Sequence, residues 1–359
     1  MKKTLTSKER VLTAFAHVEP DRVPIDYSAN PGIDLRLKQH FGLQSGDDEG
    51  LRLALGVDFR SIWAPYKGPK LFADYLDRVI DEWGIHRRWV EHDTGGYWDY
   101  TDFPLKDASL DVVNAWPLPS PDAFDLSEIM PDCDRYSNYC LVLGNAGVGD
   151  IINSTGMLRT MEQVLLDLVN DEPAFFRYVE RKTELMLEVL QRVLEAAQGK
   201  IDLFMIGEDL GTQIGPMLSV RMFRKQLRPT LQRYVDLAKA YNLPVMIHSC
   251  GSSSWAFEDF LEMGITIVDT LQPEAKNMAP GYLKTHFGDR LSFHGSVSTG
   301  GPVAYGTVQE TIENVRTTLE IMMPGGGYAM SPSHMLQDNS PTENVLAMYE
   351  TTLKAGKYD

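Results

Sequence analysis

The sequence predicts an α/β barrel built from eight parallel strands. Eight short apolar segments of strand type recur along the 359 residues, and helical segments separate nearly all of them. Strands that alternate with helices pair in parallel, and eight such units close a (β/α)8 TIM barrel. An open doubly wound sheet is the alternative, but no Gly-x-Gly-x-x-Gly follows an early strand, as a dinucleotide site would require. We therefore expect one barrel domain over residues 1–359, a length that single barrels with insertions reach.

The elements follow in order from local signals. Thr6-Ser-Lys-Glu9 is a capping box that opens a first helix, and helical patterns recur near 33–41 and 51–55. In the second half, helices are expected from about Asp171, after Ser219 and over 255–263. Thr307-Val-Gln-Glu310 is a second capping box, and Pro341 suits the first position of the closing helix. The expected strands begin near Val23, Val57, Leu141, Leu203, Pro244, Ile265, Leu291 and Tyr328.

Residues from about 66 to 131 break this alternation. Aromatic side chains crowd together there with Gly95-Gly96 and several prolines, namely Trp83, Trp89, Tyr97, Trp98, Tyr100 and Trp116. Short strands and turns fit such a composition. We expect an irregular insertion in the N-terminal half of the barrel. Its aromatic side chains either pack the insertion onto the main body or form a ligand cage, and their density does not decide between the two.

Charge and composition exclude several classes of partner. The net charge of -16 and the pI near 4.9 argue against nucleic acid or an anionic membrane as a general partner. No apolar run approaches 18 residues, and no apolar h-region follows the N-terminal lysines, so neither secretion nor a membrane span is expected. The three scattered cysteines fit a reducing cytoplasm. We therefore expect a cytoplasmic protein.

A histidine and a cysteine lie two residues apart after the strand that begins at Pro244. His248 and Cys250 offer an imidazole and a thiolate at one strand end, a pair typical of zinc sites. The alternative is a buried cysteine that packs as a small hydrophobe beside a hydrogen-bonded histidine. Two ligands fall short of the usual three or four, so the hypothesis needs further groups at the same place.

Chemistry in this fold lies at the carboxyl ends of the strands. The residues there are Asp26, Tyr27, Trp63, Asn145, Glu208, Asp209, His248, Cys250, Asp269, Gln272, His294, Ser333 and His334. Glu208, Asp209, Tyr27 and Asn145 are our candidates for catalysis. Each group also has a structural interpretation: Glu208-Asp209 as a solvated acidic turn, His294 as a structural histidine and Asp269 as a loop cap.

Several motifs together carry a resemblance over nearly the whole chain. They include Pro20-Asp-Arg-Val-Pro24, Glu208-Asp-Leu-Gly-Thr-Gln213, His248-Ser-Cys-Gly251, Phe293-His-Gly295 and Ser331-Pro-Ser-His334. On these the chain resembles the uroporphyrinogen decarboxylase superfamily, in particular its corrinoid-dependent methyltransferase branch. The true decarboxylases carry an arginine-rich Met-Arg-Gln-Ala-Gly-Arg segment that grips porphyrin carboxylates. This chain has Tyr27-Ser-Ala-Asn-Pro-Gly-Ile33 in that region, which disfavours porphyrin decarboxylation.

The resemblance implies a zinc-dependent methyltransferase. His248 and Cys250 match the zinc ligands of that branch, while His334 stands where the branch has a third ligand, a cysteine in Ser-Pro-Gly-Cys. Glu208 is our candidate for the fourth position. The methyl group would move between a corrinoid protein and a small thiol or methoxy compound. The chain has no Asp-x-His-x-x-Gly motif, so the corrinoid would come on a partner protein. A decarboxylase-like lyase acting on another carboxylate, and a non-catalytic binding protein, are the alternatives.

Overall fold

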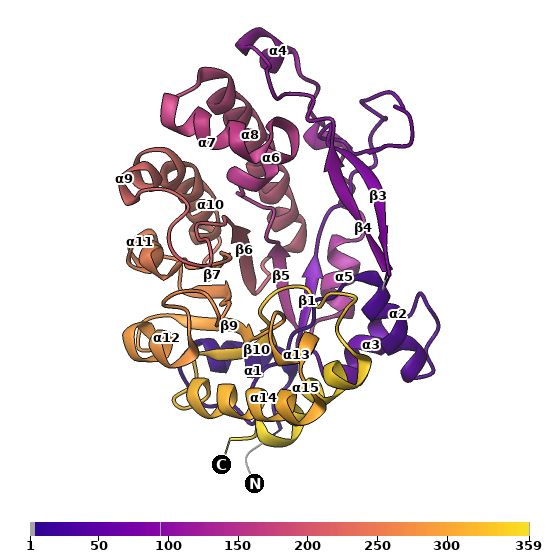
Figure 1. Ribbon diagram of the computed structural model, residues 1–359, viewed down its shortest axis with the longest axis vertical. Helices are drawn as coiled ribbons and strands as arrows, with labels where there is room; N and C mark the ends of the chain where they lie inside the picture. Colours follow the sequence, from indigo (N-terminus) through magenta and orange to yellow (C-terminus); the bar gives the residue numbers. More distant parts are fainter. Residues whose placement is uncertain (1–3, 94, 359) are drawn as a thin grey trace.

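The protein is built around a curled, seven-stranded parallel sheet. The computed structural model describes residues 4–93 and 95–358, and the strand order is β1-β5-β6-β7-β8-β9-β10 (Figure 1). The strands are β1 (Phe59–Ile62), β5 (Cys140–Gly144), β6 (Leu203–Gly207), β7 (Val245–His248), β8 (Ile267–Thr270), β9 (Ser292–Val297) and β10 (Tyr328–Pro332). Strands that follow one another along the chain are neighbours in this sheet, as the expected alternation of strands and helices requires.

The expected first strand, near Val23, does not form a full ladder. Only Ile25 bridges Met330 of β10, in parallel. The segment nevertheless lies between the two edges of the sheet, because Met330 N–H donates to Pro24 O at 2.8 Å and Asp58 N–H donates to Ile25 O at 2.8 Å. Pro24 has no N–H to offer a neighbouring strand, which shortens any ladder here. The structure thus shows seven paired strands and one bridging segment rather than eight complete strands.

A buried carboxylate holds this segment against β1. Asp58 is fully buried, and its side chain accepts hydrogen bonds from Arg10 and Arg22 at 2.7 Å each and from the backbone N–H of Ile25 at 2.9 Å. Arg10 also binds Asp21 through two of its nitrogens. These arginines and carboxylates therefore join the first helix, the bridging segment and β1.

Helices cover the outer face of the sheet. The main-body helices are α1 (Ser7–Phe15), α2 (Pro31–His40), α3 (Asp48–Leu55), α6 (Ile152–Arg159), α7 (Met161–Asn170), α8 (Pro173–Ala197), α9 (Val220–Met222), η2 (Phe223–Leu227), α10 (Arg228–Ala240), η3 (Ser254–Ala256), α11 (Phe257–Met263), α12 (Pro280–Phe287), α13 (Pro302–Tyr305), α14 (Val308–Met322) and α15 (Thr342–Ala355). Both expected capping boxes are present, at Thr6 and Thr307. The helix after Ser219 contains a π-helical turn, η2, that its sequence did not predict.

Residues 66–131 contain a separate antiparallel sheet. Its strands are β2 (Val79–Ile80), β3 (His86–His92) and β4 (Gly95–Thr101), and α4 (Leu110–Ala115), η1 (Pro121–Ala123) and α5 (Ile129–Arg135) follow. β3 and β4 stand to one side of the curled sheet (Figure 1). Trp83 and Trp116 pack on the main body, whereas Trp89 and Trp98 contact each other edge to face and are 49% and 46% exposed. Some of these aromatic residues therefore anchor the insertion, and others stay at the surface.

Two apolar layers flank the curled sheet. The larger lies between the sheet and its helices. The smaller fills the inside of the curl, where it includes Phe59, Val142, Leu203, Met246, Ile267 and Ala329. Burial of both faces explains why the strands are nearly continuous apolar runs. Within residues 4–93 and 95–358, no helix combines the length and the apolar character that crossing a membrane requires.

Candidate metal centre

The ends of two neighbouring strands bring three ligand groups together. β6 and β7 pair in parallel with Gly207 opposite His248, so the residues just after each strand lie side by side. Asp209 follows β6 and Cys250 follows β7. The backbone N–H of Cys250 donates to Oδ1 of Asp209 at 2.7 Å, which fixes the two loops to each other.

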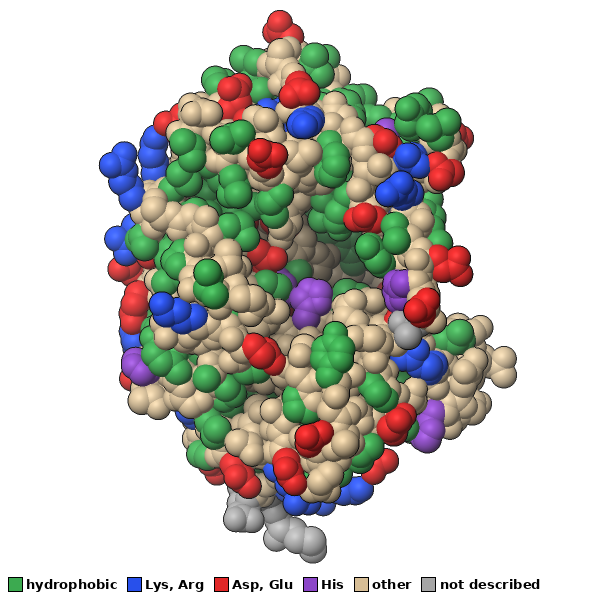
Figure 2. Space-filling view, in the orientation of Figure 1, with side chains coloured by type: hydrophobic (Ala, Val, Ile, Leu, Met, Phe, Trp, Pro, Cys, Tyr) green, Lys and Arg blue, Asp and Glu red, His purple; other side chains and the backbone are tan. Residues whose placement is uncertain are grey.

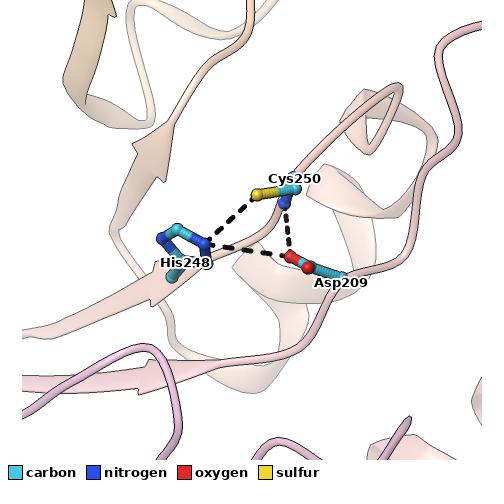
Figure 3. Close-up of side chains that lie close together, drawn as sticks. All are labelled: Asp209, His248 and Cys250. Carbon is cyan, nitrogen blue, oxygen red and sulfur yellow. Dashed lines mark hydrogen bonds and ion pairs between the residues drawn. The ribbon is translucent and has the colours of Figure 1, made fainter. Parts of the chain in front are cut away.

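The side chains of Asp209, His248 and Cys250 converge on one point (Figure 3). Sγ of Cys250 lies 3.3 Å from Nε2 of His248, and Oδ1 of Asp209 lies 3.9 Å from the same nitrogen. One ligand atom from each residue lies within 4.8 Å of the others, and no second group of three such ligands occurs in the described part of the chain. Two ligands of one tetrahedral zinc ion are separated by roughly 3.3–3.7 Å, so the sulfur–nitrogen spacing suits a shared ion.

A carboxylate behind His248 determines which ring nitrogen faces the site. Nδ1 of His248 donates to Oδ2 of Asp269 at 2.6 Å, and Oγ1 of Thr270 lies 2.6 Å from the same nitrogen. In the neutral ring with its proton on Nδ1, the lone pair of Nε2 would face Cys250 and Asp209, where a metal ion would take the place of a second proton. A carboxylate that binds the far nitrogen of a ligating histidine is typical of protein zinc sites.

Asp269 extends this chain of hydrogen bonds through β9 to the bridging segment near Ile25. Its Oδ1 accepts from Nδ1 of His294 at 2.5 Å, and Nε2 of His294 donates to Oδ2 of Asp26 at 3.1 Å. Burial alone lowers the pKa of His294, but the charges of Asp269 and Asp26 outweigh it and raise this pKa to about 10. Burial likewise raises the pKa of Asp269, yet the His294 charge and the hydrogen bonds from both histidines lower it overall. Asp269 is therefore ionised, as its role behind His248 requires.

The backbone at Thr270 is held in a rare conformation. Thr270 has φ = 86°, although it is β-branched, and Leu271 follows with φ = 51°. Gly295 lies against it, because a Cβ at that position would come within 2.4 Å of Thr270 O. Strain of this kind persists where the surroundings impose it and is common at functional sites. Here it directs the Thr270 hydroxyl toward His248.

The pKa values of His248 and Cys250 are both shifted by their surroundings. Burial lowers the pKa of His248, but its hydrogen bonds to Asp269 and Cys250 raise it well above the usual value. Burial raises the pKa of the Cys250 thiol, although His248 opposes this. The hydrogen bonds of His248 thus favour a positive charge on its ring. A soft thiolate, an imidazole of fixed tautomer and a carboxylate make a donor set that fits zinc.

His334, the expected third ligand, lies next to this group but outside it. Its ring centroid is 6.3 Å from that of His248, in an edge-to-face arrangement. Burial lowers the pKa of His334, and the charge of His248 lowers it further. His334 is therefore neutral, the form in which a histidine binds a metal.

Glu208, the expected fourth ligand, points elsewhere. Its two carboxylate oxygens accept from the backbone N–H groups of Ile151 at 2.8 Å and Ile152 at 3.3 Å. Burial raises its pKa well above the usual range, and nearby Asp150, whose own pKa burial raises to about 7, adds to the effect. The carboxylate that the structure brings to His248 and Cys250 is that of Asp209, which also accepts from Nδ2 of Asn153 at 2.8 Å.

Two cavities meet at the histidines. The inner cavity, of about 350 Å³, lies in the mouth of the curled sheet and has His248, Asp269, His294 and His334 in its wall. The outer cavity, of about 690 Å³, lies between the insertion and α6, and His248, His334 and Asp209 line it as well. Figure 2 shows a hollow in this face with histidine side chains at its edge. His248 and His334 thus line both cavities.

The other two catalytic candidates, Tyr27 and Asn145, line the inner cavity. The Tyr27 hydroxyl donates to Asp34 at 2.8 Å, and Oδ1 of Asn145 accepts from the N–H of Gly147 at 2.8 Å. Sequence reasoning missed Thr270 and Arg52 in this wall. Arg52 is on a helix rather than at a strand end, so the rule that located the other residues could not find it.

Comparisons with known proteins identify the family of the chain. The sequence model for uroporphyrinogen decarboxylase (URO-D) matches residues 151–354, more than half of the chain. The chain belongs to the URO-D family. A solved structure of a methyltransferase from Methanosarcina mazei is similar to it, with a TM-score of 0.66 and 16% sequence identity over 98% of this chain and 99% of that one. Among curated proteins, none matches the sequence. The matched URO-D region contains Asp209, His248, Cys250 and His334.

Proposed function

We propose that this URO-D family member is a zinc-dependent methyltransferase, which moves a methyl group between a corrinoid protein and a small thiol or methoxy compound. One observation carries the proposal: a thiol and an imidazole nitrogen lie 3.3 Å apart beside a carboxylate, at the open end of the sheet. A family member needs no such soft ligand pair to bind porphyrin carboxylates, whereas methyl transfer to or from sulfur or oxygen uses it directly.

The chain's own residues would hold the metal as follows. Nε2 of His248 and Sγ of Cys250 are two ligands, with Asp209 and His334 as the candidates for the remaining positions. Bound zinc would deprotonate a thiol or withdraw charge from a leaving oxygen. Asp269 keeps the proton on Nδ1 of His248, and the apolar residues below the site limit the entry of water. Glu208 has the separate task of binding the backbone at Ile151 and Ile152.

The corrinoid would come on a partner protein. The outer cavity opens on the face that carries the candidate ligands, so a partner bound there could present its cofactor to them. The inner cavity would then hold the small molecule on the other side of the same residues. Free thiols at Cys133, Cys140 and Cys250 are consistent with a cytoplasmic location for both proteins.

We also propose that residues 1–359 form one barrel domain with 66–131 as its insertion. The bridging segment near Ile25 would take the eighth position, because it is hydrogen-bonded to β10 and to the residue before β1. The structural neighbour, which covers 98% of this chain, supports a single fold over this length.

The test combines metal analysis with a methyl-transfer assay. The purified protein should contain about one zinc per chain. Given methylcobalamin as a stand-in for the partner, it should methylate a small thiol, or in the reverse direction demethylate a methoxy compound with reduced cobalamin. Spectral change of the corrinoid and mass spectrometry of the product report the two sides of the reaction. A zinc-free protein that decarboxylates a small acid would favour the lyase, and binding without turnover would favour the binding protein.

A further inference from the structure

One arginine in the wall of the inner cavity has no partner of its own. Arg52 is in α3, and its side chain forms no hydrogen bond or ion pair within residues 4–93 and 95–358. Three other arginines in the N-terminal part of the chain form ion pairs. Arg10 and Arg22 bind Asp58, and Arg60 binds Glu49.

The carboxylates near Arg52 have other partners. Lys38 binds both Asp34 and Asp48. Asp26, in the same cavity wall, accepts from Nε2 of His294 at 3.1 Å and from the N–H of Tyr27 at 2.8 Å. Arg52 therefore lines this wall without a carboxylate partner of its own. It is also the only arginine or lysine among the described residues that line the inner cavity.

The rest of the cavity limits what this charge can bind. The floor is apolar and comes from the inner layer of the sheet, with Phe59, Val142, Met205 and Met246. The volume of about 350 Å³ is near the lower end for ligand pockets. A single guanidinium and an apolar floor fit one carboxylate on a small apolar body. They do not fit a tetrapyrrole with many carboxylates, which would need several cations.

We propose that the small molecule of the methyl-transfer reaction is a monocarboxylate, whose carboxylate binds Arg52 while its apolar body lies on Phe59 and Met246. His248 and Arg52 line the same cavity. His248 ends β7, and Arg52 is in α3, the helix before β1. In the curled sheet β7 is the third strand from β1. A molecule bound at Arg52 thus extends its other end, with the oxygen or sulfur that carries or accepts the methyl group, toward the ligand cluster. This inference rests on the proposed function and names its substrate class.

The test compares acids with their uncharged amides. The probes are 3-methoxybenzoate and 3-(methylthio)propanoate, each paired with its primary amide, and binding to the full-length protein is measured by calorimetry. At least one acid should bind roughly ten- to a hundred-fold more tightly than its amide, because a guanidinium–carboxylate pair is a charge-assisted contact. Arg52→Gln should remove this preference, and Arg52→Lys should retain part of it. Arg316→Gln, in α14 and away from the inner cavity, is the matched control and should change nothing.

The outcomes separate this inference from the proposed function. Arg52→Gln should unfold at the same temperature as the wild type, because no bond within the described chain is lost. Equal binding of acid and amide by the wild type, no binding of either acid, or an unchanged preference in Arg52→Gln would overturn the inference. If zinc binding and thiol methylation persist in that case, the proposed function survives alone. If the acids bind through Arg52 but the protein holds no zinc, the substrate class survives and the metal mechanism fails.

Discussion

Nδ1 of His248 donates a 2.6 Å hydrogen bond to Oδ2 of Asp269, and this contact turns Nε2 toward the thiol of Cys250. His294 also contacts carboxylates, whereas the second ring nitrogen of His248 faces a thiol. Together the two contacts favour a metal ligand over the structural interpretation of the same residues. The predictions below begin with these groups.

Replacement of the thiol should remove the metal but keep the fold. In Cys250→Ser we expect zinc to fall from about one per chain to a small fraction, because a serine hydroxyl is a poor ligand for zinc. Methyl transfer should be lost with it, whereas the stability of the metal-free protein should change by less than about 1 kcal/mol. Elemental analysis and urea unfolding measure the two effects. Cys133→Ser, a buried thiol in α5, is the control and should retain its zinc. Normal methyl transfer by Cys250→Ser would refute the metal mechanism.

A cysteine in place of His334 should also bind zinc. His334→Cys restores the residue that the resembling methyltransferases have, and a second thiolate should tighten zinc binding, measured by competition with a chelator. Binding should also release one more proton than in the wild type, because a thiol must ionise to ligate. Proton release is measured in a weakly buffered solution with a pH indicator. Unchanged affinity and unchanged proton release would show that residue 334 is not a ligand.

Asp269, which contacts His248, should matter more for zinc affinity than Asp26, which contacts only His294 of the two histidines. Asp269→Asn removes the charge that holds Nδ1–H of His248, and we expect zinc affinity to fall about 10–100-fold. Asp26→Asn disturbs the far end of the same chain of hydrogen bonds without contact to His248, so its loss should be much smaller. Titration with zinc and a competing chelator gives both affinities. Equal losses in the two variants would contradict the assigned role of Asp269.

The raised pKa of His294 should make the free energy of unfolding depend on pH. Its folded-state pKa of about 10 lies above the unfolded value of about 6.5, so the folded protein binds more protons between these limits. Its contribution to stability is complete below about pH 6.5 and declines by at most about 1.4 kcal/mol per pH unit until pH 10. Urea unfolding of wild type and His294→Gln from pH 6 to 10 isolates this contribution as a difference. His286→Gln, an exposed histidine on α12, should follow the wild type. A difference that does not shrink with rising pH would count against a charged His294.

Loss of the Asp58 carboxylate, which holds the bridging segment against β1, should lower the free energy of unfolding more than loss of an exposed carboxylate. Asp58→Ala leaves Arg10 and Arg22 without their buried partner, and we expect a loss of about 3–5 kcal/mol in the free energy of unfolding. Glu258→Ala breaks an exposed pair with Arg290 and should cost under about 1 kcal/mol. Denaturant unfolding measures both. Similar costs would mean that the Asp58 cluster does not secure the segment near Ile25.

Local patterns in the sequence were enough for most of the elements. The capping boxes at Thr6 and Thr307 bond neighbours three residues away, and the strand near Pro244 is a run of buried side chains. These signals act within a few residues and do not depend on the rest of the chain. His248 and Cys250 were found for the same reason, since their spacing belongs to one strand end. Where Pro24 deprived the backbone of a donor, the expected strand was reduced to a single bridge.

Tertiary structure decided which carboxylate completes the cluster. Glu208 and Asp209 are adjacent in the sequence, but only the pairing of β6 with β7 and the backbone N–H of Cys250 place Asp209 beside the thiol. The N–H groups of Ile151 and Ile152 take Glu208 away from it. The role inferred for Arg52 also depends on tertiary structure. Lys38 and His294 bind the neighbouring carboxylates Asp34 and Asp26, and Arg52 is left without a partner. Competition among polar groups for partners is settled in three dimensions, and no spacing along the chain records its outcome.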